Sequence, residues 1–348
     1  MTATMVPNDL APAARGLLLS LAWIREHLRE FSIGPVSDAS FSKDDVAKLK
    51  PLSELALTLS VLRKCGVDVA FLDEAAAWAW EDCAGGDAIV RLLLVRPDFL
   101  PCCALYVALT ELGFKSTHVE QTITTIGRTD MARSLPLQPW SRLALDYNLA
   151  KLGVIEPSRI RTHDLYALSK PEPWVVSAEI AYAVTHEVMY LTDFGSRNLP
   201  DPAATEWLDT WMPYWGRSFQ RDGDWDVLGE LAMVSACISR PSEALAVVLA
   251  HQQPDGSVVG PDGAGSYLFG PTDTLDRRRF LGAYHTTLVF AMACGLTLRM
   301  AARISEDSRP VPLKLTRFRG HPTVGASSPR SGSPHVEPQA AISARVPG

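Results

Sequence analysis

The stretch GAYHTTLVFAMACGLTLRM, residues 282–300, shows most directly how the chain is built. It is apolar over most of its length, which is typical of a helix that is buried on all sides. A Tyr–His–Thr–Thr cluster nevertheless occupies its first two turns. The preceding residues 251–271, HQQPDGSVVGPDGAGSYLFGP, are rich in Gly, Pro and Asp, which indicates a loop. The sequence therefore predicts a loop that leads into a buried helix with polar groups near its N-terminal end.

Earlier segments repeat this arrangement, with a half-polar helix followed by a nearly all-apolar one. The apolar helices are expected to end at Gly66, Gly113, Gly153 and Gly195, because glycine favours the left-handed conformation that closes a helix. These glycines are 47, 40 and 42 residues apart, and a period in the forties is typical of helical-hairpin repeats. The expected hairpins pair residues 14–31 with 52–65, 68–83 with 99–112, 116–126 with 140–152, 157–168 with 177–194, 203–219 with 225–238, and 242–252 with 282–300.

The pattern predicts an all-α fold in which apolar helices form an inner layer and half-polar helices an outer one. Six such hairpins favour a closed α/α toroid over an open solenoid, because an open array usually carries polar capping repeats at its ends. Residues 1–304 are predicted to form this single domain. Residues 305–348 are rich in Pro, Ser, Gly and Arg. We expect them to be a disordered tail, since they bury too little apolar surface to offset the entropy of ordering.

Composition restricts the partners of the protein. The 348 residues are 47% hydrophobic and 21% charged, with a net charge of −6, as in ordinary globular proteins. An acidic surface attracts neither nucleic acid nor an anionic membrane. No apolar run of about 18 residues is free of charges, so no membrane-spanning helix is predicted. The six cysteines form no CxxC motif and lie mostly in apolar segments, which indicates reduced core residues of a cytoplasmic protein.

Two segments resemble a known protein family. Residues 252–263, QQPDGSVVGPDG, resemble the Q-x-x-D-G-x-x-G-G loop of terpenoid cyclases and protein prenyltransferase β-subunits. Residues 283–298, AYHTTLVFAMACGLTL, resemble the last inner helix of the prenyltransferases, whose Tyr-His-Thr sequence supplies a zinc-ligand histidine. The resemblance implies a toroid, and a divalent metal held by Asp224, Asp226 and His285 in a metal-dependent prenyl-type transferase.

This sequence departs from the family pattern at one of the metal ligands. The family has an Asp-x-Cys pair about sixty residues before the histidine, and here Asp226 stands in place of the cysteine. A site without the thiolate is harder and binds zinc more weakly, so thiol alkylation does not follow from the resemblance. The DxDD proton donor of the cyclases is also missing. The resemblance therefore supports the toroid and the place where its cavity opens more strongly than prenyl chemistry.

Polar residues on the predicted inner helices are the candidates for a site. An apolar helix must expose, pair or protonate any carboxylate that it carries. Asp226 and Glu230 are spaced i, i+4 on one face, which suits acid–base chemistry; the alternative is an acid that the macrodipole of the helix N-terminus stabilises. His285 is either a functional group or part of a capping cluster. The expected catalytic residues are His186, Glu187, Asp226, Glu230 and His285.

Further polar residues are expected to hold a substrate. Tyr182, His186 and Tyr190 follow one another at steps of four, so they share one face of a helix. The alternative for this stripe is a buried hydrogen-bond network. Arg142 is suited to an anionic group, although a salt bridge to a neighbouring helix would also explain it. The expected substrate-binding residues are Tyr182, Tyr190, Arg142, Tyr284 and Thr286.

The leading hypothesis is an enzyme that acts on a small organic molecule inside the toroid cavity. Cyclisation, elimination or group transfer, as in the tailoring of secondary metabolites, suits an apolar cavity that excludes water from reactive intermediates. One alternative is a non-catalytic scaffold whose ring binds a peptide or a partner enzyme. The other is the metal-dependent transferase. Both enzyme hypotheses require the polar groups to converge on one cavity.

Overall fold

The computed structural model describes residues 10–34, 43–270 and 273–306. These residues form fourteen α-helices and no strand, so the predicted all-α class is confirmed. The chain divides into two compact units, Met1–Leu315 and Thr316–Gly348, and every described residue belongs to the first. The α-helices are α1 (Ala11–Glu26), α2 (Lys43–Lys64), α3 (Ala70–Asp82), α4 (Asp87–Val95), α5 (Cys103–Glu111), α6 (Thr117–Gly127), α7 (Asp130–Ser134), α8 (Pro139–Lys151), α9 (Tyr166–Ser169), α10 (Ala178–Leu191), α11 (Pro202–Asp222), α12 (Trp225–Cys237), α13 (Glu243–His251) and α14 (Leu275–Glu306).

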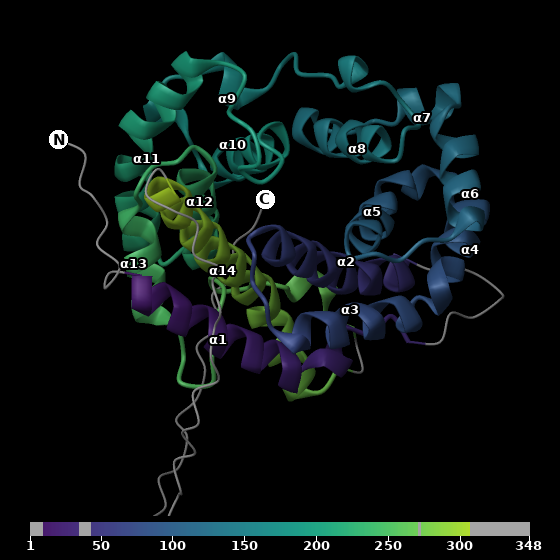
Figure 1. Ribbon diagram of the computed structural model, residues 1–348, viewed down its shortest axis with the longest axis horizontal. Coiled ribbons are helices and arrows are strands. Elements are labelled where there is room, and N and C mark those ends of the chain that lie inside the picture. The colour runs from purple at the N-terminus through teal and green to yellow at the C-terminus, as the bar shows by residue number, and fades with distance from the viewer. Residues whose placement is uncertain (1–9, 35–42, 271–272, 307–348) are drawn as a thin grey trace, which may run out of the picture. The chain divides into compact units, whose positions relative to one another are not determined.

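Six of these helices pack against one another in sequence: α2, α5, α8, α10, α12 and α14 (Figure 1). Each contacts the next, and α14 contacts α2. Helices α2 and α14 run in the same direction, because their contacts advance together along both segments. Glu54 of α2 contacts His285 of α14, and Leu62, two turns further on, packs against Gly295. The N-terminal ends of α2 and α14 therefore lie on the same side.

The predicted glycine stops are confirmed at Gly66, Gly113 and Gly153, whereas α10 ends at Leu191, and Asp193 and Phe194 already have positive φ before Gly195. Gly66, Gly113, Gly153 and Gly195 all have positive φ, between 67° and 103°, a conformation that other residues adopt only at a cost. The glycines follow the ends of α2, α5, α8 and α10. Hydrogen bonds at these ends, such as the one from the Gly113 N–H to the Thr110 carbonyl at 3.0 Å, satisfy carbonyls that the helix leaves open.

Helix α14 forms the centre of the core. It packs against α1, α2, α12 and α13, and its residues from Leu288 to Met300 are almost all buried. By length and composition, Leu275–Ile304 could cross a membrane, and it is the one such helix among the described residues. Within the fold, 78% of its most apolar window is buried. A core helix meets the same criterion, since it too is surrounded by apolar atoms.

Several predicted boundaries differ from the structure. Helix α14 begins at Leu275, before the expected start at residue 282, and continues through Gly295 without a break. Gly295 instead gives room to Leu62, because an added Cβ would lie 2.5 Å from its side chain. Helix α2 begins at Lys43, inside the expected loop 32–50, and α4 was not expected. Of the expected tail, residues from 307 onward lie outside the described part of the chain.

The expected outer helix at residues 157–168 is wrong. Only a 3₁₀ turn at Pro157–Arg159 and the single-turn α9 form there. The cause is Asp146 on α8, which accepts hydrogen bonds from both the backbone N–H and the guanidinium of Arg161. This buried carboxylate holds the segment in an irregular conformation that satisfies both partners.

Candidate functional site

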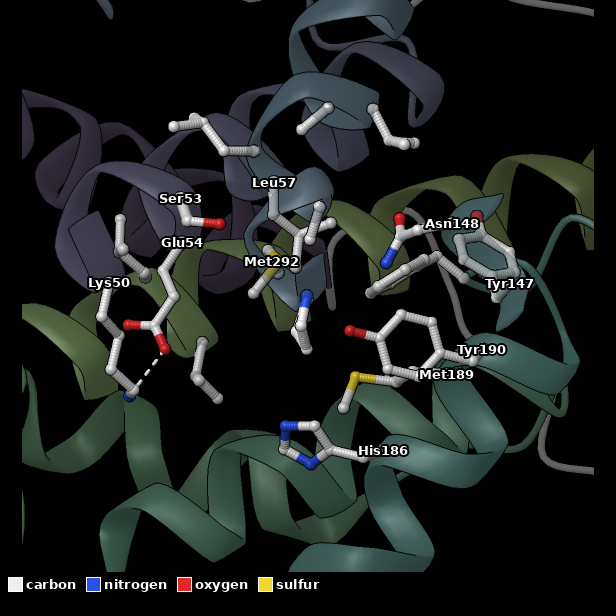
Figure 2. A pocket seen from close by; sticks show the side chains of 18 of the residues that line it. Lys50, Ser53, Glu54, Leu57, Tyr147, Asn148, His186, Met189, Tyr190 and Met292 are labelled. Atoms are coloured by element: carbon white, nitrogen blue, oxygen red, sulfur yellow. Dashed lines mark ion pairs between the residues drawn. The ribbon is translucent and has the colours of Figure 1, made fainter. Parts of the chain in front are cut away.

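A cavity of about 380 Å³ lies among the six helices that contact one another in sequence. Each of the six contributes to its lining, and Figure 2 shows Glu54, His186 and Tyr190 pointing into it. Most of the wall is apolar or aromatic, which is usual for sites that bind small molecules. The apolar and aromatic lining includes Leu57, Trp140, Met189, Met233, Leu288 and Met292.

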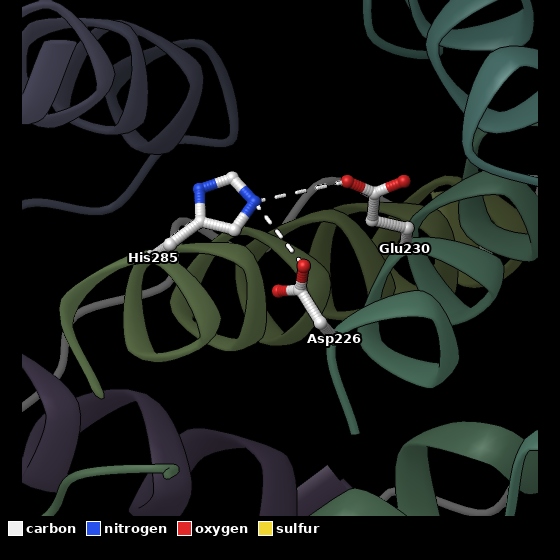
Figure 3. Close-up of side chains that lie close together, drawn as sticks. All are labelled: Asp226, Glu230 and His285. Carbon is white, nitrogen blue, oxygen red and sulfur yellow. Dashed lines mark ion pairs between the residues drawn. The ribbon is translucent and has the colours of Figure 1, made fainter. Parts of the chain in front are cut away.

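One end of the cavity carries an acid–histidine cluster, which consists of Lys50, Glu54, Asp226, Glu230 and His285. The Nε2 atom of His285 lies 3.4 Å from Oδ2 of Asp226 and 4.0 Å from Oε1 of Glu230. Figure 3 shows both carboxylates directed at this nitrogen. On the other side of the ring, Nδ1 lies 3.1 Å from Oε2 of Glu54. The imidazole is therefore held between carboxylates from α2 and α12.

Glu54 was not among the predicted site residues. Its second oxygen lies 2.7 Å from the Nζ atom of Lys50, one turn earlier on α2 (Figure 2). The contact to His285 spans 231 residues of sequence, so no local pattern points to it. One sequence feature sets Glu54 apart: it is the single acidic residue between residues 50 and 64, in a segment that is otherwise mostly apolar.

The start of α12 places the two carboxylates. The side chain of Asp224 accepts a hydrogen bond of 3.1 Å from the Val227 N–H and caps the helix. Asp226 then lies in the first turn, where the Thr286 hydroxyl donates to it over 3.1 Å. Gly229 lets α12 approach α14 closely at this level, because an added Cβ would lie 2.8 Å from Val289. Asp224 therefore caps the helix, and Glu230, rather than Asp224, lies beside Asp226 and His285.

Glu230 connects the cluster to α10. The residue is only 1% exposed, and its Oε2 atom accepts a hydrogen bond from the Thr185 hydroxyl. The Nδ1 atom of His186 lies 3.5 Å from the same oxygen and 2.9 Å from the Tyr182 carbonyl. The rings of Trp140 and Tyr182 lie 4.9 Å and 4.0 Å from that of His186. His186 therefore contacts both the buried Glu230 carboxylate and the aromatic rings of α8 and α10.

The surroundings shift the pKa values of His285, Glu54 and Asp226. Burial disfavours the charged form of His285, but the charges of Asp226 and Glu54 outweigh burial and raise its pKa to about 9. Burial also acts on Glu54, yet the charges of His285 and Lys50 hold its pKa well below the usual range. For Asp226, burial and the charge of Glu230 raise the pKa although His285 opposes them. The cluster thus brings together an imidazole and a carboxylate whose pKa values are both raised.

A second polar group, the lysine network, consists of Lys64, Glu111, Tyr147, Lys151 and Asp193. Of these, Glu111 and Tyr147 line the cavity, and Tyr147 lies across it from Lys50 and Glu54 (Figure 2). The two lysines each contact both acids, at distances between 2.7 Å and 3.3 Å. The Tyr147 hydroxyl donates to Asp193 over 2.6 Å. Two positive charges face two negative ones, so the network is electrically balanced and links α2, α5, α8 and the end of α10.

Of the predicted catalytic and substrate-binding residues, Glu187 and Arg142 line neither the main cavity nor the side pocket beside it. Glu187 is fully buried on another face of α10, where it accepts a hydrogen bond of 2.8 Å from the Ala167 N–H. Burial raises its pKa to about 7, and its Oε1 atom has no hydrogen-bond partner among the described residues. Arg142 donates to the carbonyls of Ala132 and Leu135 beside α7. Both side chains therefore secure outer segments rather than a substrate.

A side pocket of about 290 Å³ adjoins the cluster beneath the loop that precedes α14. It shares Lys50, Tyr182 and His285 with the main cavity, and Asp226 lies in its wall. Tyr284 and Thr286 line this pocket, so of the predicted substrate-binding residues only Tyr182 and Tyr190 line the main cavity. The loop is bound to the helix by the hydrogen bond from the Gly260 N–H to the Gly282 carbonyl at 2.9 Å.

Three residues of the cluster could hold a metal ion. Asp226, Glu230 and His285 offer ligand atoms that lie within 4.8 Å of one another, and they are the one such group in the described ranges. Two carboxylates and an imidazole suit zinc, iron or manganese. The contact of Glu54 with Nδ1 resembles the outer carboxylate that commonly orients a metal-bound histidine.

Comparison with known proteins gives a family but no activity. The family described as a domain of unknown function, DUF6895, matches residues 17–295, and the chain belongs to this family. The match covers the six cavity helices from α2 to most of α14. No curated protein and no solved structure matches the chain.

Proposed function

We propose that this protein is an enzyme that acts on a small organic molecule inside the cavity of an α/α toroid. The contacts that lead from α2 through α5, α8, α10 and α12 to α14, and back to α2, support the toroid. The observation that carries the enzyme proposal is the convergence of Asp226, Glu230 and His285. Residues from two helices meet beside one cavity, and the pKa values of Asp226 and His285 are shifted, as acid–base sites require.

The proposed chemistry is proton transfer within a cyclisation, an elimination or a group transfer. His285 would be the general acid, since its imidazole is protonated at neutral pH. Asp226, whose pKa is raised, would take up or release a proton beside it. The apolar wall would exclude water and so strengthen electrostatic interactions with the reacting atoms. Tyr182 and Tyr190 would bound the substrate on the side of α10.

Metabolite profiling tests this proposal by offering the protein many candidate substrates at once. The wild type, Asp226→Asn and His285→Gln are incubated with an extract of small molecules, and mass spectrometry follows consumption. Glu74→Gln, an exposed acid on α3, is the control. We expect compounds that the wild type and the control consume but the two site variants leave unchanged. Consumption that is equal in all four folded proteins, or absent in all four, would contradict the proposal.

A metal-dependent transferase is the second candidate, and the grouping of three ligand atoms within 4.8 Å favours it. Asp226, Glu230 and His285 would hold the ion, whereas the resemblance implied Asp224 as the third ligand. A bound divalent ion would supply a Lewis acid next to the cavity. Metal analysis of the untreated protein, together with the visible spectrum after cobalt addition, distinguishes the two candidates. One equivalent of metal in the wild type that His285→Gln loses would favour the transferase.

A further inference from the structure

The two polar groups beside the cavity differ in charge balance. In the lysine network, Lys64 and Lys151 neutralise Glu111 and Asp193. In the acid–histidine cluster, three carboxylates face Lys50 and His285, and the Nδ1 atom of His186 lies 3.5 Å from Glu230. With the three carboxylates ionised and His186 neutral, the net charge is −1 when His285 is protonated and −2 when it is neutral. Unbalanced negative charge in a partly buried site is unfavourable, and either a proton on a carboxylate or a bound cation relieves it.

Glu230 is the carboxylate beside which an additional positive charge would lie. It is 1% exposed, and Thr185 and His186 both lie against its Oε2 atom. Its Oε1 atom lies 4.0 Å from Nε2 of His285, which is longer than a hydrogen bond. Glu230 also lines the main cavity. A carboxylate that borders a cavity can accept a charge-assisted hydrogen bond from a ligand there.

The wall next to Glu230 suits a cation that is also partly apolar. The rings of Trp140, Tyr182 and His186 lie against one another, with centroids between 4.0 Å and 5.5 Å apart, and Nδ1 of His186 lies 3.5 Å from Glu230. Faces of tryptophan and tyrosine attract cations, most strongly where water is excluded. Beyond the rings, the cavity continues along apolar side chains such as Leu57, Met233 and Met292. The cavity therefore has carboxylates at one end, aromatic rings beside them and apolar side chains along the rest of its lining.

We propose that the cavity binds an organic ammonium ion, with the charged nitrogen at Glu230 near Asp226 and an apolar body along Met233 and Met292. This proposal rests on the proposed function for the premise that the cavity holds a substrate, and it names the class of that substrate: an amine with an apolar body. The ammonium group would donate a hydrogen bond to Glu230 and bring a positive charge that balances the carboxylates of the cluster. The apolar body of the amine displaces water from the apolar part of the cavity, and the burial of its apolar surface favours binding.

Anionic ligands fit this cavity poorly. Among the described lining residues, Lys50 is the one lysine or arginine, and its charge is paired with Glu54. Arg142, predicted to hold an anion, donates to backbone carbonyls elsewhere. A diphosphate or carboxylate would be repelled by three carboxylates, and the one lysine of the lining is already paired with Glu54. A metal ion would correct the charge but leave the apolar chamber unfilled.

Three probes of similar shape test the proposal: 2-phenylethylamine, 2-phenylethanol and 3-phenylpropionate. Binding to the protein after removal of metal is measured by calorimetry and by the fluorescence of tryptophan. We expect the amine to bind at least about tenfold more tightly than the alcohol, and the carboxylate not to bind. Glu230→Gln should lower the affinity for the amine at least about tenfold and leave the affinity for the alcohol unchanged, because only the interaction between the carboxylate and the ammonium group is lost.

The control variant is Glu111→Gln, which removes a carboxylate of the lysine network from the lining of the same cavity. It should leave the preference for the amine unchanged, with thermal unfolding confirming that both variants fold. Equal binding of amine and alcohol, tighter binding of the carboxylate, or binding of none of the probes would overturn the proposal. Zinc binding at the cluster without amine binding would also overturn it, in favour of a metal ion as the cation. Amine binding without any metabolite consumption would contradict the enzyme proposal but not this one.

Discussion

Glu54 and His285 are 231 residues apart in the sequence, and a contact of 3.1 Å joins Oε2 of one to Nδ1 of the other. This contact links α2, the first of the cavity helices, to α14, the last. It also fixes the imidazole, because Nδ1 is directed at Glu54 and Nε2 at Asp226 and Glu230. The orientation of the central group of the site thus depends on the packing of the two ends of the domain.

Glu54→Gln should lower the pKa of His285 from about 9 by at least about one unit, because the variant removes one of the negative charges that stabilise the imidazolium. NMR titration of the histidine ring protons measures the shift. In the wild type the raised pKa stabilises the fold below the unfolded value of 6.5, and this stabilisation is lost as pH rises through about 9. The variant should lose it at lower pH. A pKa that stays near 9 would show that Glu54 does not control the imidazole.

Glu187→Gln should stabilise the protein above neutral pH. The pKa of Glu187 is raised from 4.5 to about 7 by burial, so the protonated form stabilises the fold below 4.5 and this contribution is lost as pH rises through 7. Glutamine is neutral at every pH and can still accept from the Ala167 N–H. We expect a gain of up to about 3 kcal/mol in the free energy of unfolding at about pH 8, and little change at about pH 4.5.

Urea unfolding of Glu187→Gln at these two pH values measures the difference. Glu179→Gln is the matched control, because Glu179 lies on the same helix but is exposed. A gain that is independent of pH would mean that the glutamine packs better rather than removing a charge. A loss at the higher pH would mean that the ionised carboxylate is needed to hold the α9 segment.

The helices could be predicted because their causes are local. The alternation of half-polar and apolar segments and the glycine stops lie within single repeats of the chain, and the structure confirms the stops at Gly66, Gly113 and Gly153. The segment at residues 157–168 could not be predicted in this way. It is shaped by Asp146, a residue of another helix that binds Arg161, and such a contact leaves no periodic pattern.

The candidate site was predictable in part for the same reason. Asp226, Glu230 and His285 interrupt apolar helices, so they are visible in the sequence. Glu54 was missed because Lys50 and Glu54 have the i, i+4 spacing of an ordinary exposed ion pair. Glu187 could have been excluded, since adjacent helical residues point about 100° apart and His186 faces the cavity. Contacts between residues far apart in the chain could not be predicted from the sequence, whereas the direction of each side chain around its helix could.

Gly256→Ala should destabilise the loop that precedes α14 more than Gly263→Ala does. Both glycines have positive φ, at 95° and 82°, so each substitution strains the backbone by about 1–2 kcal/mol. At Gly256 the added Cβ would lie 2.1 Å from the backbone oxygen of Leu19, whereas at Gly263 nothing lies within 4 Å. We expect an additional loss of about 1–3 kcal/mol for Gly256→Ala, from overpacking against α1.

Chemical unfolding of the two glycine variants gives this comparison directly. The Ser20 hydroxyl and the Gln252 amide both donate to the Gly256 carbonyl, at 3.1 Å each, so the clash should also loosen the loop. Hydrogen exchange of the Val258 N–H, which donates to Thr287 over 2.9 Å, reports that loosening. Equal losses in both variants would mean that the loop moves away from α1 without cost.

The lysine network should contribute to stability and not to ligand binding. Asp193 contacts Lys64, Lys151 and the Tyr147 hydroxyl, so Asp193→Asn leaves two lysines facing Glu111 alone. The charged groups are 20–32% exposed, and solvent screens part of their interaction. We therefore expect a loss of about 1–2 kcal/mol in the free energy of unfolding.

A double-mutant cycle separates the network from general effects of the substitution. Lys151→Met should cost less in the background of Asp193→Asn than in the wild type, because its main acidic partner is already neutral. The affinity for 2-phenylethylamine should stay within about twofold in each variant, since Glu230 is not part of the lysine network. If Asp193→Asn weakened the amine as strongly as Glu230→Gln does, the cation would have to be placed at the lysine network.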